Sequence, residues 1–136
     1  GDVYKRQMFI NQIHRRKIEK LLDGTGLHRA QHRMLMTLSD CPVTSQVELA
    51  NILEVSAATV AVSLKKLENR GFVKRIQSED NKKHIEIVLL DRAALIVEAG
   101  LNAQKQFAKN VLSGLTEEKQ VCINIFDKIC NNAEEH

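Results

Sequence analysis

The sequence predicts a mainly α-helical domain with a small β-hairpin, the arrangement of a winged helix-turn-helix. The first observation is a pair of short helical segments, capped by Ser45 and Ser56, with only Glu54 and Val55 between them. Helices joined by so tight a turn must cross steeply, which is the geometry of a helix-turn-helix. The second observation is a pair of short strand-like segments after these helices, which predicts the hairpin, or wing.

Length and composition limit the class of protein. The 136 residues are 43% apolar and 27% charged, which suits one globular domain, 8–136, with a sizeable core. The net charge is +3, and the last third is acidic, so we do not expect that third to bind a polyanion. Aromatic residues make up 4%, without tryptophan, which argues against a stacking platform for single-stranded nucleic acid.

Cysteine content and hydropathy indicate a compartment. Three cysteines, an odd number, do not make a disulfide framework and favour a reducing cytoplasm. No apolar run approaches the roughly 18 residues of a membrane span, so no membrane partner is expected.

The first seven residues, 1–7, are interpreted as a scar of sequencing or assembly. Asp2 to Gln7 can be back-translated as GATGTGTATAAGAGACAG, which resembles the end of a transposon-based sequencing adaptor. We therefore expect the native chain to begin at Met8 or further upstream, and we assign residues 1–7 no function.

Apolar spacing and end signals predict the flanking elements. Helical periodicity over 8–22 and 27–39 predicts two helices, with a glycine-containing turn between them. Period-two alternation near 85–89, after a strand at 73–77, predicts the hairpin.

Two more helices are expected after the hairpin. A long helix should run from about Asp91 to Ser113, and a last helix should begin near Leu115 with Thr116 as its cap. Acidic residues follow that cap, where the positive end of the helix dipole favours them.

The helix from Ser56 to about Arg70 carries the candidate chemistry. At 100° per residue, Val60, Leu64 and Leu67 share a core face. The other surface begins with small residues, which approach base edges closely, and ends with lysines, which neutralise phosphates. The residues of this helix-turn-helix expected to contact DNA are Ser45, Gln46, Ser56, Ala57, Ala58, Thr59, Ala61, Val62, Lys65 and Lys66.

The hairpin extends this basic surface. Arg75 lies on its first strand, and Asn81, Lys82 and Lys83 lie in its polar turn, from which they can reach the backbone or the minor groove. Two alternatives stay open: a surface helix that merely carries lysines, and a wing tip that is only a solvated loop.

In the order and spacing of these segments, the chain resembles the MarR family of winged-helix transcriptional regulators. The resemblance spans residues 9–131. The matching stretches are Gly26-Leu27 to Leu38, Ser45-Gln46-Val47-Glu48-Leu49-Ala50, Val55-Ser56-Ala57-Ala58-Thr59-Val60, Leu64-Lys65-Lys66-Leu67-Glu68-Asn69-Arg70-Gly71-Phe72-Val73 and Gly114-Leu115-Thr116-Glu117-Glu118.

The resemblance implies a homodimeric repressor that binds a pseudo-palindromic operator in double-stranded DNA and is released by a ligand or oxidant. Helices 8–22 and 91–134 would form the dimer, and 28–90 would form the DNA-binding lobe. The implied dimer residues are Ile10, Ile13, Leu112, Leu115, Val121, Ile125 and Ile129. A small anionic aromatic effector is expected in a pocket lined by His28, Arg29, His32 and Arg33.

Three positions depart from the family pattern. Asn81-Lys82-Lys83 stands where the wing usually carries Asp-x-Arg, and lysine lacks the planar fork of arginine. Val62 stands where an arginine or another polar residue is common. Glu54 replaces a frequent turn glycine, so a residue other than glycine should adopt a positive φ.

The remaining candidate groups are histidines and cysteines. His28 and His32 share a helix face at a spacing that can bind zinc, but no cysteine or acidic cluster accompanies them, so no metal or cofactor is expected. Cys41, Cys122 and Cys130 are expected to pack as buried side chains rather than to react.

Two other classes of function are alternatives to DNA binding. A winged helix that contacts protein without binding an operator would show a shallow salt dependence, whereas several phosphate contacts give a steep one. An enzyme is not expected, because the sequence contains no nucleophile elbow, phosphate-binding glycine loop or zinc motif.

Overall fold

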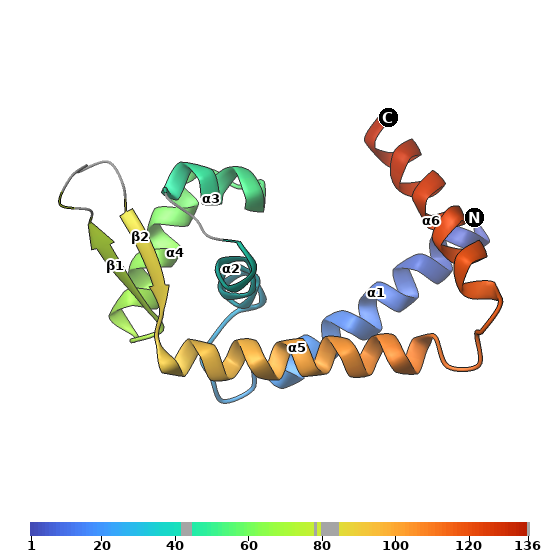
Figure 1. The fold of residues 1–136 in the computed structure, drawn as a ribbon, viewed down its shortest axis with the longest axis horizontal. Helices are drawn as coiled ribbons and strands as arrows, with labels where there is room; N and C mark the ends of the chain where they lie inside the picture. Colours follow the sequence, from blue (N-terminus) through green and yellow to red (C-terminus); the bar gives the residue numbers. More distant parts are fainter. Residues whose placement is uncertain (42–44, 78, 80–84, 136) are drawn as a thin grey trace. The chain divides into compact units, whose positions relative to one another are not determined.

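The computed structural model describes residues 1–41, 45–77, 79 and 85–135. The elements, labelled in Figure 1, are α1 Asp2–Leu21, α2 Arg29–Asp40, α3 Gln46–Leu53, α4 Ala57–Asn69, β1 Val73–Gln77, β2 Ile85–Leu89, α5 Asp91–Val111 and α6 Glu118–Glu135. Two compact units, 1–103 and 104–136, divide the chain within α5. The predicted mainly α fold with a two-stranded hairpin is confirmed.

Helix ends differ from the sequence prediction at two places. Helix α1 already begins at Asp2, so residues of the 1–7 segment continue the helix that periodicity predicted only from residue 8. The predicted Thr116 cap is wrong, because α6 begins at Glu118. The Glu118 carboxylate instead accepts a hydrogen bond from the Thr116 N–H at 3.2 Å.

The helix-turn-helix is built by the two predicted serine caps. The Ser45 hydroxyl accepts the Glu48 N–H at 3.0 Å, and the Ser56 hydroxyl accepts the Thr59 N–H at 3.1 Å. Between them, Glu54 has φ 56° and ψ 42°, the left-handed conformation expected there. The axes of α3 and α4 consequently differ in direction by 108°.

Helix α4 ends in a Schellman motif that turns the chain directly into β1. Gly71, at φ 77°, supplies the left-handed residue. The Phe72 N–H donates to the Leu67 carbonyl at 2.9 Å, and the Gly71 N–H donates to the Glu68 carbonyl at 3.1 Å. Leu67 and Phe72 are both fully buried, which is the apolar contact that commonly accompanies this motif.

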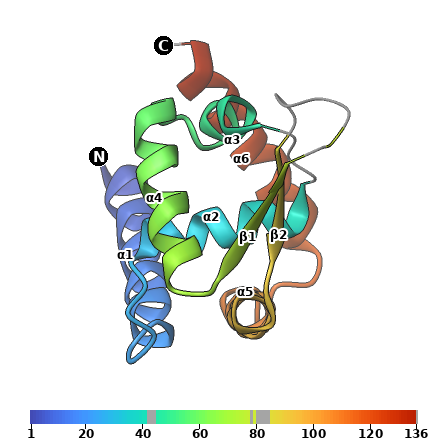
Figure 2. The ribbon, with the colours of Figure 1, turned by 90° about the vertical axis from the view of Figure 1, so that its left-hand side faces the viewer.

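Strands β1 and β2 form the wing as an antiparallel pair. Val73 lies opposite Leu89 at the base, and Gln77 lies opposite Ile85 at the outer end. Figure 2 shows the hairpin beside α4, with α3 level with the upper end of α4. The predicted tip residues Asn81, Lys82 and Lys83 lie outside the described residues.

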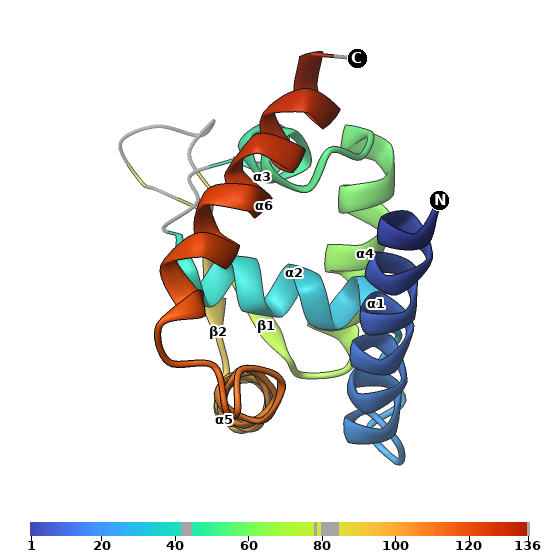
Figure 3. The ribbon, with the colours of Figure 1, turned by 90° about the vertical axis from the view of Figure 1, so that its right-hand side faces the viewer.

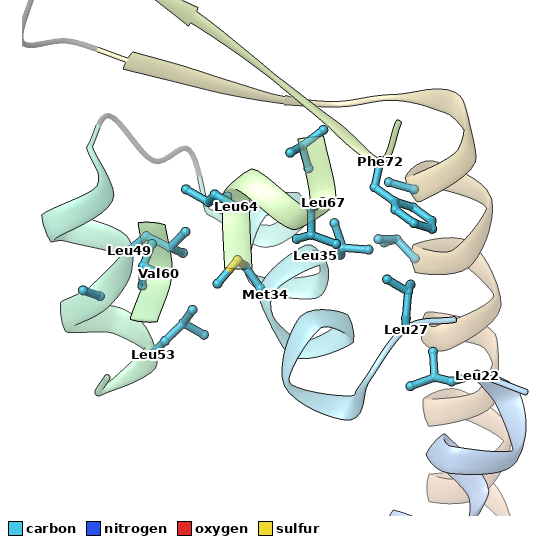
Figure 4. Packing of buried hydrophobic residues seen from close by; sticks show 14 of the residues in the cluster. Leu22, Leu27, Met34, Leu35, Leu49, Leu53, Val60, Leu64, Leu67 and Phe72 are labelled. Atoms are coloured by element: carbon cyan, nitrogen blue, oxygen red, sulfur yellow. The ribbon is translucent and has the colours of Figure 1, made fainter. Parts of the chain in front are cut away.

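One apolar core joins the elements of the first unit. Helix α2 crosses this unit behind α4 and the hairpin, as Figures 2 and 3 show from opposite sides. Figure 4 shows Leu49 and Leu53 of α3 near Val60 of α4, and Leu35 of α2 near Leu67 of α4, with Phe72 at the end near α5. The largest fully buried side chains are Phe72, Leu35, Leu49, Leu64, Leu67, Val60 and Val73.

The second unit contrasts with the first because it has few buried side chains. Helix α6 contains no buried residue in the described part of the chain. In the described chain, no single helix has the length and apolar composition required to cross a membrane; only the bent pair α3 and α4, counted together, meets those two criteria.

Candidate DNA-binding interface

Helix α4 has the orientation that its sequence predicts. Val60, Leu64 and Leu67 are fully buried and fix the inner face of the helix. Ala58 and Val62 are exposed on the outer face, Val62 by 55%. Burial of three aliphatic side chains, each contributing about 1.5–3 kcal/mol, holds the outer face towards solvent.

The N-terminal turn of α4 combines small side chains with backbone donors. All four residues from Ser56 to Thr59 are exposed. The Ser56 hydroxyl lies 2.8 Å from the Thr59 hydroxyl and caps the helix, so both side chains are held close to the backbone. A capped helix start with exposed small residues can bring its N–H groups close to a phosphate.

The other predicted residues of the helix-turn-helix border this surface. Lys65 and Lys66 are exposed towards the end of α4, where their charges can meet a phosphate backbone. Ser45, Gln46 and Ala61 are partly exposed.

Arg75 on β1 has a protein partner. Its Nε and Nη2 atoms donate to Oε2 of Glu68 on α4, at 3.0 Å and 2.7 Å. The two side chains are about a third exposed, at 30% and 34%. Arg75, predicted to contact DNA, therefore ties the wing to α4 in this structure.

Two of the four predicted effector-pocket residues lie together. Arg29 and Arg33 line a hollow of about 380 Å³ between α2 and the helix-turn-helix. Nη1 of Arg33 donates to the Leu53 carbonyl at 3.4 Å, near the turn between α3 and α4. The remaining lining residues are Ala30, Met34, Leu53, Val55, Thr59 and Ser63.

His28 and His32 do not line that hollow. His28 is exposed just before α2, and its N–H donates to the Gln31 side chain at 2.9 Å. His32 is 4% exposed, and no described residue hydrogen-bonds its Nε2 atom. A Cβ added at Gly100 of α5 would lie 2.8 Å from that nitrogen. Desolvation by this burial lowers the pKa of His32.

The predicted dimer residues divide between the two units. Ile10 in the first unit is 45% exposed, and Leu112, Val121 and Ile125 in the second are 40%, 56% and 51% exposed. Ile13, Leu115 and Ile129 are partly buried. Sequence reasoning omitted Phe9 and Phe126, which are 61% and 52% exposed. The hydrophobicity of Phe9 and Phe126 was the sequence signal that could have placed them among the predicted dimer residues.

The cysteines only partly follow the packing prediction. Cys41 packs against the core and Cys122 is partly buried, but Cys130 is exposed, so packing was wrongly predicted for Cys130. All three are free thiols. Over the described ranges, no group of three or more His, Cys, Asp or Glu residues is placed to hold a metal ion.

Comparisons with known proteins agree with this geometry. Residues 27–85 match the family model described as "MarR family". The uncharacterized HTH-type transcriptional regulator YybA of Bacillus subtilis (strain 168) is 28% identical over 109 residues, which cover 79% of this chain and 73% of that protein. YwoH of the same organism, another uncharacterized HTH-type transcriptional regulator, is 26% identical over 121 residues, 85% of this chain and 88% of that protein.

Solved structures share the fold over nearly the whole chain. A MarR protein from Peptoclostridium difficile DA00132 superposes with a TM-score of 0.78 at 20% identity, over 99% of this chain and 89% of the other. The crystal structure of MarR gives 0.65 at 25% identity, over 98% and 95%. The fold and the exposed outer face of α4 define a winged helix-turn-helix protein.

The matched domain and these relatives show what the chain is similar to. Residues 27–85 form a MarR-family domain, and the chain as a whole resembles MarR-family transcriptional regulators in sequence and fold. Regulators of this kind are not enzymes in general, and DNA binding is a property of the family.

Proposed function

We propose that the chain is a cytoplasmic, sequence-specific regulator that binds a pseudo-palindromic operator as a homodimer and acts as a repressor. One α4 helix from each protomer would enter a major groove, with half-sites about 34 Å apart. The observation that carries the proposal is the orientation of α4. Its apolar stripe is fully buried, whereas its small residues and lysines are exposed.

The outer face of α4 supports both base and phosphate contacts. Ala58 and the Thr59 methyl group are suited to thymine methyl groups, and small side chains allow close approach to base edges. Lys65 and Lys66 would contact phosphates, which position the helix without selecting a sequence. Arg75 would act mainly through Glu68, by holding the wing beside α4.

Exposed apolar side chains support the homodimer. Ile10 on α1 and Val121 and Ile125 on α6 are each about half exposed. Large apolar side chains that are exposed in a single chain can be covered by a second copy in a dimer. A second copy of the chain is the proposed partner, through Ile10, Ile13, Leu112, Leu115, Val121, Ile125 and Ile129.

Fluorescence anisotropy with the chain's own upstream DNA tests DNA binding. Lys65 and Lys66 of the two protomers would together contribute about four phosphate contacts. A plot of log K against log salt concentration should therefore have a slope of about −3.6 or steeper. Random competitor should not displace the operator at equal concentration. Lys65→Ala with Lys66→Ala should flatten the slope, whereas Lys105→Ala with Lys109→Ala, on α5, should not.

The opposite results would contradict the proposal. A verified dimer that binds upstream DNA with a shallow salt slope and no selectivity would not be an operator-binding regulator. That result would favour the protein-contact module, because such a module needs no phosphate contacts.

The hollow beside α4 supports the proposed effector. Its volume of about 380 Å³ is within the usual range for small-ligand sites. Arg29 and Arg33 supply positive charge, and Met34, Leu53 and Val55 supply apolar surface, which together suit an aromatic carboxylate. Thr59 and Ser63 of α4 also line it, so a ligand in the hollow would contact the helix proposed to enter the major groove.

Benzoate, with benzamide as the uncharged comparison, tests this site. Benzoate should protect the protein against thermal unfolding and release the operator, and Arg33→Met should abolish both effects. Arg16→Met, an exposed arginine of α1 that does not line the hollow, is the matched control. Equal responses to benzoate and benzamide would refute an anion site.

A further inference from the structure

The C-terminal end of α4 is bonded to a loop that is far away in the sequence. Arg70 follows the last residue of α4, and its Nη1 atom donates to the Gly26 carbonyl at 2.6 Å. Its Nη2 atom donates to the neighbouring Thr25 carbonyl at 3.0 Å. Thr25 and Gly26 belong to the loop between α1 and α2, so one guanidinium joins the end of α4 to that loop.

Gly26 allows this close approach. Its φ of 72° lies in the left-handed region, and a Cβ atom at this position would overlap with the Arg70 guanidinium. The loop conformation and the contact with Arg70 therefore both depend on the absence of a Cβ atom at Gly26.

A second arginine joins the same point to α5. Nη1 of Arg92, in the first turn of α5, donates to the Arg70 carbonyl at 2.8 Å. The Leu90 N–H, just before α5, donates to the Phe72 carbonyl at 3.0 Å. The start of α5 is thus bonded to the end of α4 and to the first residues of the wing.

Both guanidinium groups lie over one aromatic ring. The Cζ atom of Arg92 is 4.4 Å from the centroid of Phe72, and that of Arg70 is 5.4 Å away. Phe72 is fully buried, so the ring is a fixed platform for both cations. In the described part of the chain, neither arginine forms an ion pair.

We propose that Arg70 and Arg92 are positioning residues that set the direction of α4 relative to α5, and thereby the half-site spacing accepted by the dimer. The inference rests on the proposed function, because it requires a dimer on a two-part operator. The arginines act through the backbone carbonyls they bind, and they need not touch DNA.

The length of α4 makes its direction critical. Its 13 residues span about 20 Å at 1.5 Å per residue. A rotation of about 10° at Arg70 would therefore move the Ser56 end by about 3.5 Å, close to the roughly 3.4 Å rise of one base pair. A small loss of restraint on the direction of α4 at Arg70 is therefore enough to widen the range of half-site spacings that the dimer accepts.

Lysine substitutions test the geometry while they preserve the charge. Lysine cannot donate to two adjacent carbonyls through a planar fork or stack as arginine does. Operators with half-site spacings changed by −1, 0 and +1 base pair would be titrated with the wild type, Arg70→Lys, Arg92→Lys and Arg16→Lys. Arg16, exposed on α1, is the matched control for an arginine-to-lysine change.

We expect the wild type and Arg16→Lys to prefer one spacing at least tenfold. Arg70→Lys and Arg92→Lys should reduce that preference at least threefold, or move it to a neighbouring spacing, with an unchanged salt slope. Gly26→Ala, which pushes on the same contact from the loop, should do the same and provides a second test if one arginine variant does not fold.

The outcomes separate the two proposals. Equal losses of affinity at every spacing, with the preference ratio unchanged, would overturn the positioning role and leave the operator-binding function intact. A wild-type dimer with no spacing preference would overturn the proposed two-half-site function, and the positioning inference with it.

Discussion

Glu54 occupies a backbone conformation that costs stability. At φ 56° and ψ 42°, it is the described non-glycine residue with a positive φ, between α3 and α4. The left-handed region costs an L-residue with a Cβ about 1–2 kcal/mol. Glycine has no such cost but loses about 0.5–1 kcal/mol more on folding, through its greater freedom in the unfolded chain.

Glu54→Gly should therefore raise the free energy of unfolding by about 0.5–1 kcal/mol. For a chain of this length, that gain corresponds to an increase in Tm of about 2–4 °C. Urea unfolding followed by circular dichroism, at one fixed protein concentration, would give both the midpoint and its slope. The concentration must be fixed because dimer formation makes stability depend on it.

Two controls isolate the backbone effect. Glu54→Gln removes the charge but keeps the Cβ atom, so it should not reproduce the gain. Asn51→Gly places glycine inside α3, where it should lower stability by up to about 1 kcal/mol. An unchanged or lowered midpoint for Glu54→Gly, or an equal gain with Glu54→Gln, would refute the argument from backbone strain.

Two further predictions concern His32 and the wing. Because burial lowers the pKa of His32, the folded state favours the neutral imidazole. The free energy of unfolding should therefore keep its full value above the unfolded pKa of about 6.5. Below that pH it should fall, by at most about 1.4 kcal/mol per pH unit. His32→Leu should remove that slope in urea titrations, while His28→Asn should keep it because His32 is still present; a persistent slope in His32→Leu would assign it to another group. Glu68→Gln and Arg75→Gln should show a coupling of about 0.5–1 kcal/mol in a double-mutant cycle at low salt, since the pair is about a third exposed. Additive single effects would mean that the ion pair does not hold the wing.

The helix-turn-helix was predictable because its determinants are local. Ser45 and Ser56 cap helices through bonds to residues three positions away, and Gly71 ends α4 within the same turn. The positive φ at Glu54 was expected from the resemblance to the MarR family, in which a glycine is frequent at this turn. Hydrophobic periodicity then placed Val60 in the core and Ala58 outside it.

The contacts that sequence reasoning missed join residues that are distant in the chain. Arg70 bonds Gly26 across 44 positions, and no local pattern shows which carbonyl a guanidinium will reach. Arg75 was assigned to DNA because its charge was visible, whereas its pairing with Glu68 depends on how the hairpin lies against α4. His32 was assigned to a pocket through the resemblance to the MarR family, whereas its Nε2 atom faces Gly100 of α5.

The effector prediction shows the same limit. Arg29 and Arg33 are four positions apart and share a helix face, so their presence in one hollow follows from helix geometry. The other wall, with Thr59 and Ser63 of α4, depends on the crossing of α2 and α4. That crossing is fixed by the packed core and not by either helix alone.

Ala58→Glu tests the central claim, that the exposed face of α4 enters the major groove, most directly. A glutamate in the first turn favours the helix dipole, so the variant should fold at least as well as the wild type. Anisotropy titration should nevertheless show operator affinity reduced at least 100-fold, with a much smaller loss for the uncharged Ala58→Gln. A folded, dimeric Ala58→Glu protein that binds its operator within threefold of the wild type would show that another surface contacts the DNA.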